Sequence, residues 1–172
     1  AINEGKIDHP DFELLNLDLA SFESISLFER FFTEKGIKLD ILVNNAAIGP
    51  DLDLMLPEKE SFKQTLDINL TGTVFFTELM VKHLAVAGKV VNISSKMGSI
   101  GLCTSADSPA YRISKAALNM YTKILENRSA GKYSIATVHP GWVRTTISKS
   151  NVNGRLSPDE SAAGEQRLLY QR

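Results

Sequence analysis

Residues 39–47 read Leu39-Asp40-Ile41-Leu42-Val43-Asn44-Asn45-Ala46-Ala47, a short, mostly apolar run followed by two amides and two small residues. Mostly apolar runs of this length are typical of strands that are buried on both faces of a parallel sheet. The amides and small residues come at the carboxyl end of the strand, where open α/β sheets bind their ligands. The stretch therefore predicts a parallel sheet and the edge of that sheet at which a site would lie.

The same pattern recurs along the chain and alternates with helical segments. Further short, apolar runs predict strands at residues 12–17, 89–93 and 134–138. Apolar side chains at helical spacing predict helices over residues 22–35, 58–84 and 109–127. A last helix begins at residue 157. Strands that alternate with amphipathic helices indicate a parallel sheet covered on both faces.

Two of these helices carry sequence signals at their ends. Ser21 can cap the helix over 22–35, and Gly36 marks its end. Ser157 and Glu160 have the spacing of a capping box around Pro158, which suits a first helical turn. The apolar face of the first helix is Phe22, Ile25, Phe28 and Phe32.

The fold class that follows is α/β, with a doubly wound parallel sheet of the Rossmann type. No internal repeat, low-complexity tract or linker interrupts the pattern, so residues 1–172 form a single domain.

Composition narrows the class of protein. The 19 Lys and Arg balance 20 Asp and Glu, and a net charge of −1 argues against a nucleic-acid or anionic-membrane partner. The single cysteine, Cys103, excludes an internal disulfide framework. No apolar run is long enough for a membrane helix, and residues 1–6 have no signal-peptide character. We therefore expect a soluble, cytoplasmic protein without membrane partners, for which homo-oligomeric assembly stays open.

Tyr111 and Lys115 are the side chains with the clearest chemistry. They lie four residues apart on one predicted helix, and so share a face. A lysine ammonium near a phenol lowers the tyrosine pKa, which suits general acid–base catalysis. A solvated, partly packed pair would have the same spacing. The three histidines lack metal-ligand spacing and a lone cysteine cannot complete a thiolate site, so no metal is expected.

Taken together, the segments resemble the short-chain dehydrogenase/reductase family, with its motifs in order over residues 12–169. The resemblance implies that Ser95, Tyr111 and Lys115 are catalytic, because Ile93-Ser94-Ser95 and Tyr111-Arg112-Ile113-Ser114-Lys115 match the family's motifs. It also places Asn69, in Asp67-Ile68-Asn69-Leu70, at the family's structural and catalytic asparagine, which would hold a water.

The resemblance further implies a nicotinamide cofactor site at the carboxyl ends of the strands. Asp18 and Leu19 would contact the adenine, and Asn44-Asn45-Ala46-Ala47 would stabilise the sheet and approach the cofactor. The stretch from His139 to Thr145 would line the nicotinamide and resembles the carbonyl-reductase and sniffer-like branch. The implied cofactor-binding residues are Asp18, Leu19, Asn45, Ala46, Tyr111, Lys115, Pro140, Gly141, Val143 and Thr145.

This branch generally uses NADP, and NAD stays an alternative. The implied reaction is hydride transfer between the nicotinamide and a small carbonyl or alcohol substrate, with Tyr111 as general acid and base. Two alternatives remain: an inactive or regulatory family member that keeps the fold for binding, and a different doubly wound nucleotide binder.

Two departures from the family pattern carry expectations of their own. The family's first strand, glycine-rich turn and first helix do not precede Phe12, and its last strand and substrate loop do not follow Arg172. We therefore expect the chain to be truncated at the N-terminus and at the C-terminus, and inactive by itself. Ala47 replaces the family's usual glycine, and is strained there if φ is positive.

Overall fold

The computed structural model describes residues 13–169, and the side chains of residues 13–164. Its centre is a three-stranded sheet in the order β1 (Leu39–Asn44), β2 (Leu84–Ile93) and β3 (Ser134–Val138). Both pairings are parallel. The crossovers are α2 (Lys59–Leu66) with α3 (Thr73–Met80), and α4 (Pro109–Ser129). These pairings confirm the predicted Rossmann-like α/β class.

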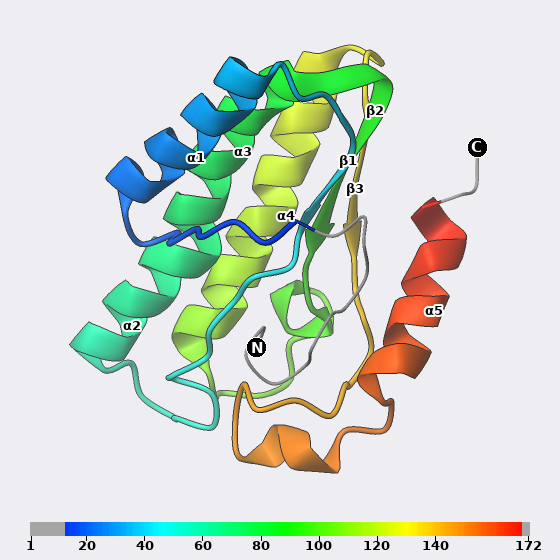
Figure 1. The fold of residues 1–172 in the computed structure, drawn as a ribbon. Coiled ribbons are helices and arrows are strands. Elements are labelled where there is room, and N and C mark those ends of the chain that lie inside the picture. The colour runs from blue at the N-terminus through cyan, green and yellow to red at the C-terminus, as the bar shows by residue number, and fades with distance from the viewer. Residues whose placement is uncertain (1–12, 170–172) are drawn as a thin grey trace.

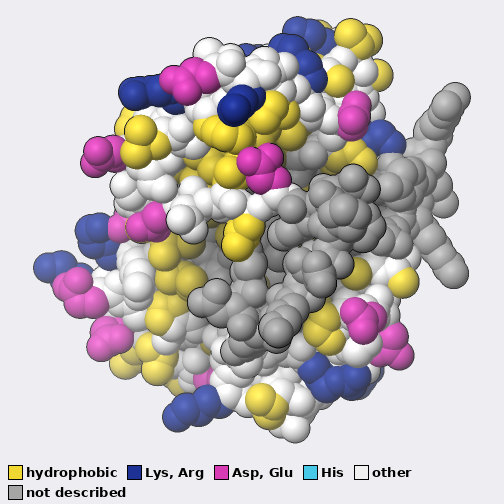
Figure 2. Space-filling view, viewed as in Figure 1, with side chains coloured by type: hydrophobic (Ala, Val, Ile, Leu, Met, Phe, Trp, Pro, Cys, Tyr) yellow, Lys and Arg dark blue, Asp and Glu magenta, His cyan; other side chains and the backbone are white. Residues whose placement is uncertain are grey.

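The helices lie on both sides of the sheet (Figure 1). One side carries α1 (Phe22–Lys35) together with α2, α3 and α4, whereas α5 (Pro158–Leu169) lies on the other side. No helix in residues 13–169 is long and apolar enough to cross a bilayer. Figure 2 shows basic and acidic side chains interspersed on the face that it presents, with apolar side chains between them.

The predicted helix signals are confirmed. The Ser21 hydroxyl accepts a hydrogen bond from the Ser24 backbone N–H at 3.2 Å, and Gly36 ends α1 in the left-handed conformation, with φ of 62°. Ser157 and Glu160 form the reciprocal capping box at the start of α5, with hydrogen bonds of 2.7 and 3.1 Å.

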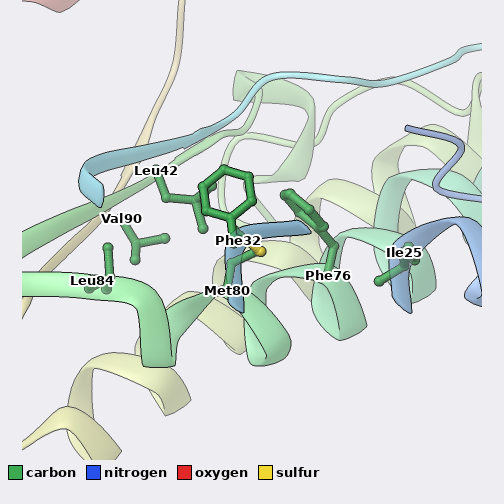
Figure 3. Close-up of a cluster of buried hydrophobic side chains, with 7 residues drawn as sticks. All are labelled: Ile25, Phe32, Leu42, Phe76, Met80, Leu84 and Val90. Atoms are coloured by element: carbon green, nitrogen blue, oxygen red, sulfur yellow. The ribbon is translucent and has the colours of Figure 1, made fainter. Parts of the chain in front are cut away.

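The hydrophobic core lies between α1, α3 and the sheet (Figure 3). Phe28 stacks on Phe32 at 5.2 Å between ring centroids and meets Phe76 edge-on at 5.4 Å. Phe22, on the same predicted face, stays 60% exposed at the helix start and contacts Phe75. The buried core residues are Ile25, Phe32, Leu42, Phe76, Met80, Leu84 and Val90.

The strand predicted at residues 12–17 is wrong: Phe12 lies outside the described residues, and residues 13–17 form no strand. Leu15 and Leu17 pack against the core. Apolar residues require burial, whereas a strand also requires a neighbouring backbone with which to form a hydrogen-bonded ladder. Leu15 and Leu17 are partly buried, but residues 13–17 form no hydrogen-bonded ladder with a neighbouring strand.

The helical segment predicted over 58–84 is present but not uniform. Between α2 and α3 it widens into a π-helical turn, Asp67–Gly72, and it ends in the short 3₁₀ turn Val81–His83. β2 then begins at Leu84, earlier than predicted. Residues 85–88 follow without partners in β1, because Leu39 pairs with Leu84 and Ile41 pairs with Lys89.

Candidate active site

Ser95 comes together with the predicted pair of Tyr111 and Lys115 at the carboxyl end of β2. Ser95 follows this strand directly, and the other two lie in the first turns of α4. The Ser95 side chain lies close enough to the Tyr111 phenol to lower the pKa of that phenol. The Lys115 ammonium lies 5.6 Å from the centroid of the Tyr111 ring, so the three side chains form one cluster.

The backbone around Lys115 explains how α4 reaches the strand end. Gly98, in the short turn after Ser95, packs so tightly that a Cβ there would lie 2.7 Å from the Lys115 carbonyl carbon. The Ser94 hydroxyl donates to the Asn119 side chain at 2.6 Å, and Asn119 donates to the Gly98 carbonyl at 3.3 Å. These contacts hold α4 against the turn that carries Ser95.

Lys115 is only 3% exposed, and its Nζ donates to the Ile93 carbonyl at 2.9 Å. Burial lowers the pKa of its ammonium to about 8. At neutral pH the group therefore remains mostly protonated. An ammonium has three N–H donors, and two of them are not used by the Ile93 carbonyl.

The Tyr111 pKa moves in the direction opposite to the sequence-based expectation. Burial raises it, the negative charge of Asp51 raises it further, and the nearby Ser95 side chain lowers it. The pKa-lowering influence that the spacing predicted for Lys115 does not prevail, because Lys115 is itself buried and directed at the Ile93 carbonyl. The phenol is therefore neutral at pH 7 and able to donate a proton.

Asn69 lies in the π-helical turn and is 1% exposed. Its side-chain oxygen accepts from the Ile48 N–H and its amide donates to the Ile48 carbonyl, both at 2.8 Å. The amide also lies 3.4 Å from the Ser114 hydroxyl. Asn69 thus ties the loop after β1 to the long helical segment and to α4. The water-holding role implied by the family remains a prediction.

Asn44 does stabilise the sheet, together with a residue that the sequence analysis did not single out. Its amide donates to the Asn92 side-chain oxygen at 2.7 Å and to the Thr77 hydroxyl at 2.8 Å. The Asn92 amide in turn donates to the Thr122 hydroxyl at 2.8 Å. A buried chain of side chains therefore links β1 and β2 to α3 and α4.

Ala47, which replaces the family's usual glycine after β1, is not among the residues with positive φ. Its backbone is therefore unstrained.

The residues expected near the adenine, Asp18 and Leu19, only partly converge with Asn45 and Ala46, which were expected to approach the cofactor. Leu19, Asn45 and Ala46 line a small pocket of about 80 Å³ beside the end of β1. Asp18 is absent from its lining and accepts from the Ala20 N–H at 2.9 Å. Ligand sites usually span about 300–1,000 Å³, so this pocket would hold only part of a dinucleotide.

The residues expected near the nicotinamide lie in the loop after β3. The Pro140 carbonyl accepts from the Ser161 hydroxyl of α5 at 2.8 Å, and Gly141 has a φ of 87°. Val143 forms a bridge with Leu156, and Thr145 is exposed. Carboxyl ends of parallel strands share one edge of a sheet. These residues follow β3 and the small pocket follows β1, so they lie on either side of β2, at whose end the Tyr111 cluster lies. Their contact with a cofactor remains a prediction.

Asp51, in the loop after β1, is a residue of this site that sequence reasoning missed. It is 1% exposed, and its carboxylate accepts from the backbone N–H groups of Ala110 and Tyr111 at 2.8 and 3.1 Å. The available signal was indirect: a helix beginning with Pro109 needs a cap, and its cap need not come from an adjacent residue.

Known proteins are similar to this chain in sequence. The family model described as short chain dehydrogenase matches residues 2–155. A 1-hydroxy-2-glutathionyl-2-methyl-3-butene dehydrogenase from Rhodococcus sp. (strain AD45) is 30% identical over 151 residues, covering 86% of this chain and 67% of that protein.

Two solved carbonyl reductases are structurally similar. The NADPH-bound carbonyl reductase from chicken fatty liver matches with a TM-score of 0.83 at 26% identity, over 95% of this chain and 71% of that chain. The carbonyl reductase Sniffer of D. melanogaster matches with a TM-score of 0.81 at 25% identity, over 95% and 72%. The chain spans 43 to 67% of the length of the first three curated relatives.

Proposed function

Because the chain belongs to the short-chain dehydrogenase family, we propose that it is an NADP-dependent oxidoreductase acting on a small carbonyl or alcohol substrate. The observation that carries this proposal is the cluster of Ser95, Tyr111 and Lys115 at the carboxyl end of the central strand. Coincidence could place any one of these side chains there, but all three meet at the edge where α/β sheets bind ligands.

The bound cofactor supplies the hydride. As the substrate carbonyl carbon gains that hydride, its oxygen becomes negatively charged and must gain a proton. The Tyr111 phenol donates that proton and becomes a phenolate. The Ser95 hydroxyl donates a hydrogen bond to the same oxygen and stabilises the developing charge.

Lys115 acts at two points in this scheme. Its ammonium, 5.6 Å from the Tyr111 ring centroid, stabilises the phenolate that is left after proton transfer. A donor not used by Ile93 would bind a hydroxyl of the nicotinamide ribose. Asn69 would position the loop after β1 and hold a water that connects Lys115 to solvent.

The protonation states favour reduction at neutral pH. Burial and the Asp51 charge raise the Tyr111 pKa, so the phenol starts the reaction protonated. The reverse reaction needs a phenolate and should require alkaline conditions.

NADP is the proposed cofactor because a carbonyl reductase of similar structure, from chicken fatty liver, is described as NADPH-bound. The proposed binding residues are those that flank the Tyr111 cluster: Leu19, Asn45 and Ala46 on one side, Pro140, Gly141, Val143 and Thr145 on the other, and Asp18 nearby. Comparing the Kd values for NADPH and NADH would test this choice, and tighter NADH binding would overturn it.

Two further parts of the proposal concern the protein's surroundings. The exposed, free Cys103 suits the reducing conditions of the cytoplasm.

Along α4, apolar residues that are about half exposed recur at helical spacing: Ile113, Met120 and Ile124. Phe75 of α3 is exposed to a similar extent. Such an apolar stripe suits assembly of the protein with a second copy. Analytical ultracentrifugation would test this, and a monomer at all concentrations would contradict it.

The central test is Tyr111→Phe, with NADPH oxidation followed across a panel of carbonyl compounds. The proposal expects kcat to fall by about 10²–10⁴-fold, because only the proton donor is removed. Tyr121→Phe is the matched control, since it removes a phenol hydroxyl from the same helix that instead donates to Glu78. A folded Tyr111→Phe variant with near-normal kcat would overturn the proposed role.

A further inference from the structure

The first turn of α4, which carries Tyr111, is not capped by the residue that precedes it. The first N–H groups of a helix have no partners within the helix and need acceptors from elsewhere. Ser108 stands at the N-cap position, but its φ of 56° is left-handed and its side chain makes no capping hydrogen bond. The acceptor therefore has to come from a more distant part of the chain.

Asp51 supplies that acceptor across a sequence separation of 60 residues. One carboxylate oxygen accepts from the N–H groups of both Ala110 and Tyr111. The other carboxylate oxygen lies 3.4 Å from the hydroxyl of Thr65, a fully buried residue of α2. The carboxylate is thus held between α2 and α4, and one of its bonds ends on the backbone of Tyr111 itself.

Two further hydrogen bonds join the loop after β1 to Ser108 at the start of α4. The Ser108 N–H donates to the Leu54 carbonyl at 2.7 Å. The Asp53 N–H donates to the Ser108 hydroxyl at 3.2 Å. Since Ser108 is 2% exposed, the loop after β1 and the start of α4 form one buried contact. Where Tyr111 lies in the site therefore depends on this loop.

We propose that Asp51 is a positioning residue for Tyr111, capping the first turn of α4 so that the phenol stays directed at Ser95 and the substrate. This role rests on the proposed function of Tyr111 as proton donor. Asp51 need not touch the substrate, because it acts through the backbone of the residue that does.

Asp51 also acts on Tyr111 through its charge. The charged groups that the described residues bring against Tyr111 are Asp51 from the loop and Lys115 from α4, and Ser95 approaches from the end of β2. The Asp51 charge raises the Tyr111 pKa, next in importance to burial. Removing that charge should therefore lower the Tyr111 pKa, and the pH at which reduction fails should fall with it.

Two variants separate position from charge. Asp51→Asn removes the charge but keeps an oxygen that can accept from the two N–H groups, whereas Asp51→Ala removes both. Asp53→Asn is the matched control, because it neutralises an exposed aspartate of the same loop. Tyrosinate absorbance is titrated in each protein, and the matching variant that also carries Tyr111→Phe is subtracted to isolate the Tyr111 signal.

The proposal expects Tyr111 to titrate at lower pH in Asp51→Asn than in the wild type, and to be unmoved in Asp53→Asn. In the same protein, the alkaline limb of the kcat profile should move to lower pH. In Asp51→Ala, kcat should fall by up to about 10²-fold with the substrate KM unchanged, because small displacements of a catalytic group are costly. If that variant does not fold, Asp51→Glu replaces it, because the longer side chain keeps the charge but moves the carboxylate away from the two N–H groups, and its kcat should fall in the same way.

The positioning role is overturned if folded Asp51→Ala has the kcat of Asp53→Asn, because the capping bonds to Ala110 and Tyr111 are then dispensable. The effect of the Asp51 charge is overturned if Tyr111 titrates in Asp51→Asn as it does in the wild type. Because the tyrosinate titration needs no substrate and kcat does, the two measurements distinguish failure of this proposal from failure of the proposed function. If no carbonyl compound is reduced by the wild type, the proposed function fails, and the tyrosinate titration still decides whether Asp51 controls Tyr111.

Discussion

The buried hydrogen bond between Asn44 and Asn92 should contribute strongly to the stability of the fold. Asn92 is fully buried, and it joins the Asn44 amide to the Thr122 hydroxyl. Asn92→Ala leaves one Asn44 N–H without an acceptor, at about 1–3 kcal/mol, and removes a bond to Thr122 of about 0.5–1.5 kcal/mol. We therefore expect the free energy of unfolding to fall by about 1.5–4.5 kcal/mol.

A double-mutant cycle tests whether that loss arises from the contact itself. Asn44→Ala removes the bond to the Thr77 hydroxyl and leaves the Asn92 oxygen without this donor. In the double variant the shared bond is lost once and neither partner is left orphaned. Its loss of stability should therefore be smaller than the summed single losses by about 0.5–3 kcal/mol.

The assay is urea unfolding followed by far-ultraviolet circular dichroism, with linear extrapolation to water. The control pairs Asn44→Ala with Ser157→Ala, which removes the distant cap of α5 and should be additive. If Asn44→Ala and Asn92→Ala add to within about 0.5 kcal/mol, the two amides act independently and the argument from their hydrogen bond is refuted.

Two further predictions concern other charged groups. Lys115→Met should raise the Kd for NADPH in a fluorescence titration, because it removes the ammonium proposed to bind the ribose, and an unchanged Kd would contradict this role. The hydrogen bonds from Thr33, Lys82 and His83 lower the Glu29 pKa from its ordinary 4.5 to about 2, so Glu29 contributes stability above pH 4.5 that is lost as pH falls towards 2. Wild-type stability should therefore fall more steeply than that of Glu29→Gln over this range in urea unfolding, and parallel curves would exclude the contribution.

The features that the sequence predicted correctly depend on residues close together in the chain. The Ser21 cap needs only the N–H three residues later, and the Ser157–Glu160 box closes over the same distance. The strand at residues 134–138 agrees with its structural bounds, because it is flanked by a turn and by Pro140. Local chemistry is sufficient for such elements.

The features that the sequence did not predict depend on contacts between residues that are far apart in the chain. Residues 13–17 have the apolar character of a strand, but no ladder forms there. The π-helical turn around Asn69 coincides with two hydrogen bonds to Ile48, which lies 21 residues earlier. Asp51 reaches the start of α4 from a loop whose sequence shows no sign of that contact. Nothing in the local spacing of these residues identifies the partner.

For Tyr111, the sequence correctly predicted one property that depends on local spacing and wrongly predicted one that depends on tertiary structure. The four-residue spacing to Lys115 correctly predicted that the two groups would be neighbours, since a helix fixes that geometry. It predicted the wrong direction for the tyrosine pKa, because burial and the charge of Asp51 act on the phenol through tertiary structure. A lysine nearby lowers a phenol pKa only in so far as its charge outweighs the cost of burying the phenolate. A motif can therefore locate a proton donor, but the loops packed around it determine whether that proton is held at neutral pH.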